Sequence, residues 1–261
     1  MGTWVLDLDG VVWRGDELVP GADGAVDALL AAGHQVVACT NWAQSPAHKR
    51  AALDRLGVAP FPVVTSAEAA ASRCAPSDRV LVLGDPTLGD VLRSAGLEVV
   101  DVFALPDGAP VGAVDVVVVG ACSDWDRSRV GMAADAVRAG ARFVATNGDA
   151  TFPTSGPSGP RLLPGNGALV AALTVASGVV PEVAGKPHGA MARLLETRFG
   201  TVDVVVGDRP DTDGGLAVEL GAEFGLVLSG ITTSVDLPVE PAPTWVADDL
   251  ASLVAAALSV A

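Results

Sequence analysis

The residues of this chain that could do chemistry are acidic side chains placed directly after apolar runs. Asp7 and Asp9 end the first such run, which begins at Thr3 and reads as a buried strand. Side chains two apart on an extended segment point the same way, so the two carboxylates face one site. One could attack phosphorus while the other moves the proton of the leaving group. An ordinary Asp-Gly turn after a strand would give the same pattern.

A second pair of polar residues, Thr40-Asn41, also ends an apolar run, 35–40. A hydroxyl and a free backbone amide at the end of a strand can hold the oxygens of a phosphate group. Taken alone, the pair is more simply read as two turn residues.

A positive charge to balance such an anion is offered by Lys186, in the sequence Gly185-Lys186-Pro187-His188. This stretch lies at the start of a predicted helix, and a compact ammonium and a helix N-terminus both favour a phosphate. A lysine on a solvated surface is the ordinary alternative. We read His188 as a helix-start residue rather than a catalyst.

The last acidic group follows the apolar run 202–206 and contains Asp208 and Asp213. Carboxylate oxygens are hard ligands that suit Mg²⁺, which keeps several waters and takes few protein carboxylates. A solvated acidic turn is the alternative, and we keep it for Asp211, which can cap the helix that follows.

Apolar runs and helical patterns alternate along the chain, which predicts a doubly wound parallel sheet, an α/β fold. The carboxyl ends of parallel strands meet at one edge of such a sheet, where ligands bind. The runs expected as strands are 3–9, 35–40, 63–65, 202–206 and 224–228. The segments expected as helices are 21–32, 45–56, 190–199, 211–220 and 248–258, with an alanine-rich helix from Ser66.

A middle set of elements, about 77–178, could form an inserted smaller domain, which leaves 1–76 and 179–261 as the core. Its expected strands are 79–83, 114–119 and 142–145, and its expected helices are 85–95, 126–139 and 167–177. Residues 147–166 are rich in Gly and Pro and show little periodicity. We expect a long loop there, of the kind that is usually functional.

Composition narrows the class of protein. Half of the residues are hydrophobic and 18% are charged, which predicts a sizeable buried core. The formal net charge of −15 argues against a nucleic-acid partner. No apolar stretch reaches the ~20 residues that span a bilayer. An anionic substrate would need a locally positive site, because the field of the whole chain repels it.

The expected location is the cytoplasm. The N-terminus shows neither the basic region nor the apolar core of a signal peptide. The three cysteines, Cys39, Cys74 and Cys122, are widely spaced and odd in number, which suggests reduced thiols rather than a disulfide frame or a zinc site.

Taken together and in this order, the four motifs resemble those of the haloacid dehalogenase-like (HAD) hydrolase superfamily, over essentially the whole chain. The matching motifs are, in order, Asp7-x-Asp9-Gly-Val, Thr40, Lys186 and Gly-Asp208-x4-Asp213. Further stretches resemble its NagD-like, or p-nitrophenyl phosphatase, group: Asp9-Gly-Val-Val-Trp-Arg-Gly, Thr40-Asn41, 145–154, 163–168 and Gly185-Lys-Pro187. The resemblance implies a Rossmann-like core with an α/β cap inserted between the second and third motifs. Such a cap would account for the middle set of elements.

For the chemistry, the resemblance implies a Mg²⁺-dependent phosphatase that works through a phospho-aspartate. Asp7 would be the nucleophile and a metal ligand. Asp9 would be the general acid and then the base for the attacking water, with its backbone carbonyl on the metal. Lys186 would orient Asp7, Asp208 would bind Mg²⁺ directly, and Asp213 would bind it through water. Mg²⁺ and Lys186 would supply the local positive field that the chain lacks.

The resemblance also implies where a substrate is held. Thr40 and Asn41 would bind the phosphate, while Trp42, Asn147 and Asp149 are expected to contact the substrate near the cap loops. Trp42-Ala43 stands where the group commonly has Asn-Ser or Ser-Ser, a departure that bears on substrate choice. The cap would close over the site and exclude water.

Proteins of this group act on small phosphomonoesters, and we expect a sugar, polyol or glycerol phosphate. A nucleoside monophosphate is the alternative substrate, since Trp42 could stack on a base. A phosphotransferase on the same scaffold is the alternative reaction. A binding protein without turnover is disfavoured by the intact set of Asp7, Asp9, Lys186 and Asp208. A homodimer through the cap is compatible with the resemblance.

Overall fold

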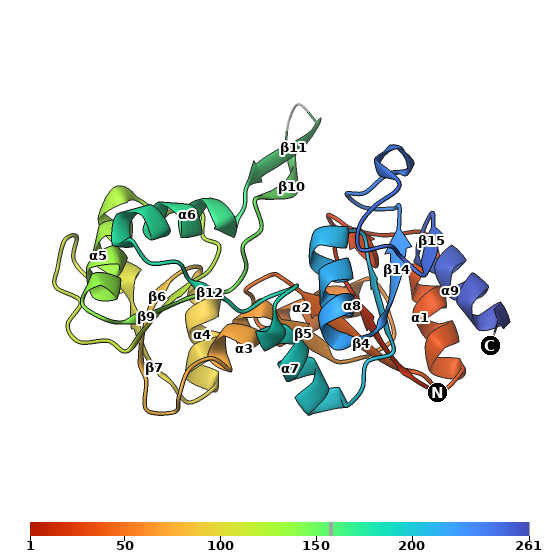
Figure 1. The fold of residues 1–261 in the computed structure, drawn as a ribbon, viewed down its shortest axis with the longest axis horizontal. Helices are drawn as coiled ribbons and strands as arrows, with labels where there is room; N and C mark the ends of the chain where they lie inside the picture. Colours follow the sequence, from red (N-terminus) through yellow and green to blue (C-terminus); the bar gives the residue numbers. More distant parts are fainter. Residues whose placement is uncertain (157–158, 261) are drawn as a thin grey trace. The chain divides into compact units, whose positions relative to one another are not determined.

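The computed structural model describes residues 1–156 and 159–260, and the chain divides into two compact units. Unit 1 is discontinuous and comprises Met1–Thr40, Pro46–Val64 and Lys186–Ala261. Unit 2 comprises Asn41–Ser45 and Thr65–Gly185. Each unit is built on its own parallel sheet covered by helices (Figure 1), so the α/β architecture predicted from the sequence is confirmed.

Unit 1 contains a six-stranded sheet in the order β15-β14-β13-β1-β4-β5. The central strand β1 runs parallel to β13 on one side and to β4 on the other. Parallel neighbours bring the carboxyl ends of their strands to the same edge. The strands are β1 (Thr3–Leu6), β4 (Gln35–Thr40), β5 (Val63–Thr65), β13 (Val204–Gly207), β14 (Glu223–Val227) and β15 (Trp245–Ala247).

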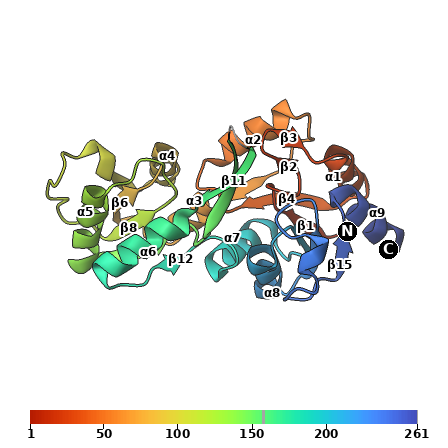
Figure 2. The same ribbon diagram turned by 90° about the horizontal axis from the view of Figure 1, so that it is seen from above.

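Helices cover both faces of this sheet because alternate strand residues point to opposite faces and nearly all of them are apolar. Trp4 and Leu6 of β1 face a cluster that contains Leu29 of α1, Leu53 of α2 and Leu253 of α9. Helix α1 packs beside α9, and α7 packs beside α8 (Figure 2). Helix α8 also contacts β13 and β14. The helices are α1 (Ala22–Ala31), α2 (Pro46–Arg55), α7 (Gly189–Phe199), α8 (Gly215–Leu220) and α9 (Leu250–Val260).

Shorter elements of unit 1 connect these strands and helices. A small hairpin, β2 (Trp13–Arg14) and β3 (Glu17–Leu18), follows the first acidic motif. The helix expected over 211–220 begins as a π-helical turn, η2 (Pro210–Gly214), and continues as α8. A 3₁₀ turn, η3 (Ser234–Asp236), precedes β15.

Unit 2 contains a five-stranded parallel sheet in the order β12-β9-β8-β6-β7. All four valines of β8 are fully buried, as expected for a strand covered on both faces. One face packs on α5 and α6, and α4 packs on α3 and β7. The elements are α3 (Ser66–Ala71), β6 (Arg79–Leu83), α4 (Pro86–Ser94), β7 (Glu98–Asp101), η1 (Val102–Ala104), β8 (Val116–Val119), α5 (Arg127–Arg138), β9 (Arg142–Ala145), α6 (Asn166–Ser177) and β12 (Glu182–Val183).

The structure corrects the expectation of a long loop over 147–166. Two antiparallel strands, β10 (Thr151–Gly156) and β11 (Gly159–Pro164), pair there, and residues 157 and 158 of the expected loop lie outside the described residues. The prolines led to the wrong prediction because a proline cannot donate to a ladder. They occupy alternate register pairs, such as Pro153↔Leu162, and an antiparallel pair has hydrogen bonds only at every second position.

Among the residues that the structure describes, there is no helix of the length and apolar character that crossing a membrane requires.

Candidate active site

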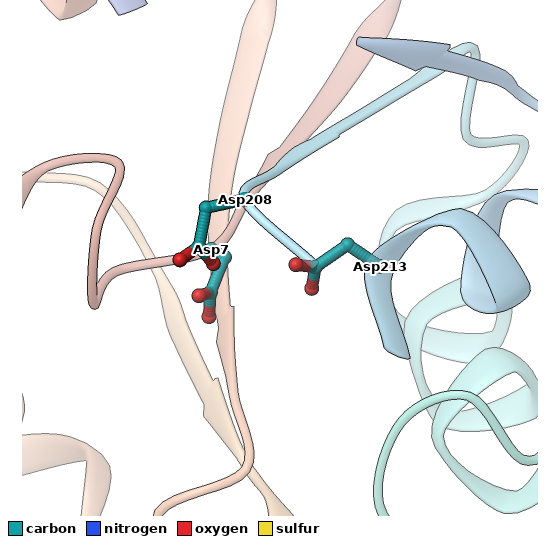
Figure 3. Close-up of side chains that lie close together, drawn as sticks. All are labelled: Asp7, Asp208 and Asp213. Carbon is teal, nitrogen blue, oxygen red and sulfur yellow. The ribbon is translucent and has the colours of Figure 1, made fainter. Parts of the chain in front are cut away.

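Three acidic side chains meet at the carboxyl ends of two neighbouring strands of unit 1. Asp7 follows β1, and its amide donates to the carbonyl of Val206 on β13 at 2.8 Å. Asp208 directly follows β13, and Asp213 lies in the π-helical turn η2. All three are buried, and they offer carboxylate oxygens within 4.8 Å of one another. Figure 3 shows their side chains pointing toward a common point.

Glycines make room for the carboxylate of Asp208. A Cβ atom at Gly230 would lie 1.9 Å from Oδ2 of Asp208, and one at Gly10 would lie 2.5 Å from the same atom. Gly10 also has a φ of +85°, which a residue with a side chain rarely adopts. The backbone amide of Ile231 donates to Oδ2 of Asp208 at 2.6 Å. The loop after β14 therefore fixes Asp208 from the side opposite to its own strand.

Lys186 pairs with two of these three acids. Its Nζ donates to Oδ1 of Asp7 at 2.7 Å and to Oδ1 of Asp213 at 2.6 Å, and only 4% of its surface is exposed. Burial alone would lower the pKa of Lys186, but the carboxylates of Asp213 and Asp7 raise it well above its ordinary value. The ammonium is therefore a permanent charge that orients Asp7, as expected of a buried lysine between two acids.

One ammonium does not balance three buried carboxylates. Burial and then the charges of Asp7 and Asp213 raise the pKa of Asp208 to about 8. Burial raises the pKa of Asp213 to about 6, against the lowering effect of Lys186. A hard divalent cation that takes oxygen ligands would supply the missing charge, and the donor set of these residues fits such an ion.

Asp9 lies beside this group and is held by an aromatic side chain. The indole Nε1 of Trp13 donates to Oδ1 of Asp9 at 2.9 Å. Burial and the charge of Asp7 raise the pKa of Asp9, while Lys49 and the Trp13 hydrogen bond lower it. Thr40 is almost completely buried at the end of β4, the strand next to β1, so its hydroxyl belongs to the same edge of the sheet.

The other residues predicted to bind substrate belong to unit 2 and form a network of their own. The side-chain amide of Asn147 donates to the carbonyl of Asn41 at 2.7 Å, and the amide of Asn41 donates to Oδ1 of Asp149 at 3.0 Å. Asn147 is buried, whereas Trp42 is 39% exposed and meets the ring of Phe152 edge-on at 6.2 Å. The structure thus uses Asn147 and Asp149 to hold Asn41, and it leaves Trp42 accessible.

Two family models match the N-terminal and the C-terminal parts of the chain. Residues 4–98 match a model described as haloacid dehalogenase-like hydrolase, and residues 183–253 match a HAD-hydrolase-like model. A D-glycerol 3-phosphate phosphatase from Mycobacterium tuberculosis is 38% identical over 95% of this chain and 70% of the relative. The chain belongs to the haloacid dehalogenase-like hydrolases.

Two further HAD relatives are named for activities on small phosphate esters. A dihydroxyacetone phosphatase from Corynebacterium glutamicum is 30% identical over 96% of this chain and 90% of the relative. An acid sugar phosphatase from Staphylococcus aureus is 30% identical over 92% of this chain and 91% of the relative.

Solved HAD structures agree with this assignment. The 4-nitrophenylphosphatase from Thermotoga maritima superposes with a TM-score of 0.85 at 29% identity and covers 98% of this chain and 97% of its own. NagD from E. coli K-12 gives 0.80 at 27% identity over 96% and 97%. The glycerol phosphate phosphatase from M. tuberculosis in complex with magnesium gives 0.81 at 37% identity over 97% and 76%. This chain is a phosphomonoester phosphatase of the NagD, or p-nitrophenyl phosphatase, group of HAD hydrolases.

The motifs of this HAD chain did not include one residue that the structure brings to the site. Lys49 of α2 is buried, and its charge acts on both Asp9 and Asp7. Burial lowers the pKa of Lys49, and the two carboxylates raise it. A signal existed in the sequence, because Lys49 precedes the core residue Leu53 by four positions and so shares its helix face.

Proposed function

We propose that the protein is a Mg²⁺-dependent phosphatase of small phosphomonoesters that works through a phospho-aspartate on Asp7. The observation that carries the proposal is the buried carboxylate of Asp7, held at 2.7 Å by the ammonium of Lys186. A carboxylate fixed and oriented in this way, beside acids that could hold a divalent cation, is what in-line attack on a phosphate group requires.

In the first step, an oxygen of Asp7 attacks phosphorus, and the bond between phosphorus and the ester oxygen breaks. The ester oxygen takes a proton from Asp9 and leaves as an alcohol. In the second step, a water molecule gives a proton to Asp9 and attacks the phosphorus of the phospho-aspartate. Inorganic phosphate leaves, and Asp7 regains its free carboxylate.

The metal ligands would be the carboxylates of Asp7, Asp208 and, through water, Asp213, with the backbone carbonyl of Asp9. When bound, Mg²⁺ neutralises the oxygens of the phosphate group and of the acidic cluster. Lys186 would hold Asp7 and Asp213 both with and without the metal. Thr40 and Asn41 would donate to phosphate oxygens, the role expected of them from the sequence.

Relatives support a three-carbon or sugar phosphate as the substrate. Two of them are named for glycerol 3-phosphate and dihydroxyacetone, and a third for acid sugar phosphatase activity. Glycerol phosphate is our first candidate. A nucleoside monophosphate is the second, because the half-exposed ring of Trp42 offers a surface on which a base could stack.

The test is phosphate release from p-nitrophenyl phosphate, glycerol phosphates, dihydroxyacetone phosphate, hexose phosphates and nucleoside monophosphates, with Mg²⁺ and with EDTA. We expect turnover only with Mg²⁺ and the highest kcat/KM for a polyol or sugar phosphate. A preference for nucleotides that is lost in Trp42→Ala would establish the second candidate. Equal turnover in EDTA would contradict the proposal.

Three broader expectations belong to the same proposal. We propose 1–76 and 179–261 as the catalytic core and 77–178 as the cap, which the discontinuous unit 1 and the intervening unit 2 support. The cysteine pattern supports a cytoplasmic location. A homodimer through the cap would give twice the mass of the chain in light scattering, and surface charges introduced on unit 2 would abolish it.

A further inference from the structure

Lys49 occupies a position that is unfavourable for a positively charged side chain. Only 8% of its surface is exposed, and it lies in the first turn of α2, where the helix dipole disfavours a positive charge. It lies four positions before Leu53, which is fully buried, so the two side chains share the face of α2 that packs on the core. The charges of Asp9 and Asp7 offset part of these costs, while burial still holds the pKa of Lys49 below its ordinary value.

Trp13 connects Lys49 to Asp9. The Nζ of Lys49 lies 5.6 Å from the centroid of the Trp13 ring, within the range of a cation–π interaction. The Nε1 of the same indole donates to Oδ1 of Asp9 at 2.9 Å. A cation over the ring draws electron density from it and makes the N–H a stronger donor, as coupled polar contacts in a buried site do.

The indole cannot easily turn away from Asp9. Trp13 is 4% exposed and belongs to the hydrophobic core of unit 1. Its backbone amide donates to the carbonyl of Leu8 at 3.1 Å, and its carbonyl accepts from the amide of Gly10 at 2.7 Å. Two backbone hydrogen bonds thus fix Trp13 to the loop that carries Asp9. Because Oδ1 of Asp9 is engaged by the indole, Oδ2 is the oxygen left to carry a proton.

We propose that Lys49 and Trp13 are positioning residues that hold the carboxyl group of Asp9 for proton transfer to the ester oxygen. They therefore decide how well the enzyme cleaves esters whose leaving group is a poor one. The inference rests on the proposed role of Asp9 as the acid. As the bond from phosphorus breaks, its electron pair goes to the ester oxygen, and an alkoxide needs the proton from Asp9 to leave. A p-nitrophenolate leaves without one.

The experiment compares an alkyl phosphate with p-nitrophenyl phosphate in Lys49→Met and Trp13→Phe. The alkyl phosphate is glycerol phosphate, or whichever alkyl ester the wild-type enzyme hydrolyses best. We expect the release of the alcohol in a single turnover to slow by roughly 10- to 100-fold, a partial loss of the general-acid contribution. For p-nitrophenyl phosphate we expect the single-turnover release of p-nitrophenolate to change by less than about 3-fold, because the breaking of the bond needs no proton. A single turnover is measured because the later hydrolysis of the phospho-enzyme uses Asp9 as the base for both substrates. Lys49→Arg should restore most of the alkyl-ester activity, since it keeps the cation over the ring.

The matched control is Arg55→Met, which removes a positive charge from the last turn of the same helix at an exposed position. It should leave the ratio of the two activities unchanged. If circular dichroism shows that Lys49→Met or Trp13→Phe is unfolded, the same comparison is made with Lys49→Gln and Lys49→Arg. Equal losses on both substrates would overturn the proposal, because a purely structural role predicts them.

Asp9→Asn separates this inference from the function on which it rests. It should show a larger difference between the two substrates in a single turnover than either positioning variant does. If Asp9→Asn affects both substrates equally, the assignment of Asp9 as the acid is wrong. If Asp9→Asn discriminates between them and Lys49→Met does not, only the inference about Lys49 and Trp13 is wrong.

Discussion

Both units are built on parallel sheets whose strands are short runs of apolar residues covered by helices, yet the ends of those strands differ. In unit 1, β1 and β13 lead directly into Asp7 and Asp208, which are buried and lie within reach of one cation. In unit 2, β6 and β8 lead into Gly84 and Gly120, and β9 leads into Thr146. The two units therefore share an architecture, but among the described residues the cluster of acids lies at the strand ends of unit 1 and not at those of unit 2.

An acid that follows a strand of unit 2 shows what the difference means. Asp85 follows β6 by two positions, but its Oδ1 accepts from the amide of Thr87 at 2.9 Å and caps helix α4. An acid at this position stabilises a helix. In the described structure, Asp7 instead pairs with the ammonium of Lys186 at 2.7 Å, and Asp208 accepts from the amide of Ile231 at 2.6 Å. Function in this molecule is thus set by side chains at strand ends rather than by the fold.

The largest effect that this comparison predicts is on activity. Asp7→Asn should lower kcat by roughly 10⁴-fold or more, as the loss of a nucleophile does. Asp85→Asn, at the end of the corresponding strand of unit 2, should change kcat by less than about 3-fold, because asparagine is an equally good helix cap. Phosphate release by the two purified variants measures both. Similar losses in the two variants would mean that the acids at the strand ends of the two sheets do not differ in function.

The next effect is on stability. Lys186→Met leaves the carboxylates of Asp7 and Asp213 buried without their ammonium, and in EDTA it should lower the free energy of unfolding by about 3 kcal/mol. Arg142→Met breaks an ion pair with Asp78 in unit 2, where the arginine side chain is 48% exposed, and should cost at most about 1 kcal/mol. Urea titrations measure both changes. Equal losses would show that the buried pairs of unit 1 are no stronger than surface ones.

A further effect should appear as a dependence of stability on pH. In EDTA, Asp208 and Asp213 hold protons in the folded protein, with pKa values of about 8 and about 6, whereas in the unfolded chain they have lost them above the ordinary value of 3.8. The folded state thus binds more protons, so the free energy of unfolding should fall by several kcal/mol between pH 4 and pH 8. Saturating Mg²⁺ should remove most of this slope, since it favours the ionised carboxylates.

Asp208→Asn is the control for that dependence. It removes a titrating group with little change of shape, so the part of the slope above pH 6 should be lost, while any effect of the net charge of −15 remains. Urea titrations at pH 5 and pH 8 measure it. A wild-type protein equally stable at both pH values in EDTA would contradict the charge imbalance described for the site.

The smallest effect concerns the polar network of unit 2. Asn147→Ala removes the donor to the carbonyl of Asn41 and the acceptor for the amide of Asp149, at 2.7 and 3.1 Å. Buried groups left without partners cost about 1–2 kcal/mol in stability. Because no reacting atom is touched, kcat for p-nitrophenyl phosphate should fall by less than about 10-fold. A loss as large as that of Asp7→Asn would make Asn147 part of the chemistry.

Most strands could be predicted from the sequence because they are uninterrupted apolar runs. The runs 79–83 and 142–145 coincide with β6 and β9, and the acidic motifs lie at strand ends as expected. Strands β7, β12 and β15 were not predicted. They are two to four residues long, and β7 carries an acidic residue at each end, so none shows an apolar run longer than three residues. Pairing with a longer neighbour decides such segments.

The candidate site could be predicted only as far as motifs mark it. Asp7, Lys186 and the motif that holds Asp208 and Asp213 lie far apart in the sequence and meet in the structure. Lys49 has no motif, and its importance depends on α2 packing against the loop that carries Asp9. Likewise, the amide of Ile231 reaches Asp208 only because a glycine allows the loop after β14 to come close. Such contacts between distant segments are set by tertiary packing, which local patterns do not contain.

The most direct test of the central claim is detection of the phosphoryl group on Asp7. Asp9→Asn should still form the phospho-enzyme from p-nitrophenyl phosphate but hydrolyse it slowly, because the base for the attacking water is lost. Acid quenching and mass spectrometry of peptides should then find one phosphoryl group on the peptide that contains Asp7. It should be absent in EDTA and in the double variant that also carries Asp7→Asn. Turnover without any such adduct, or a phosphoryl group on another residue, would contradict the account.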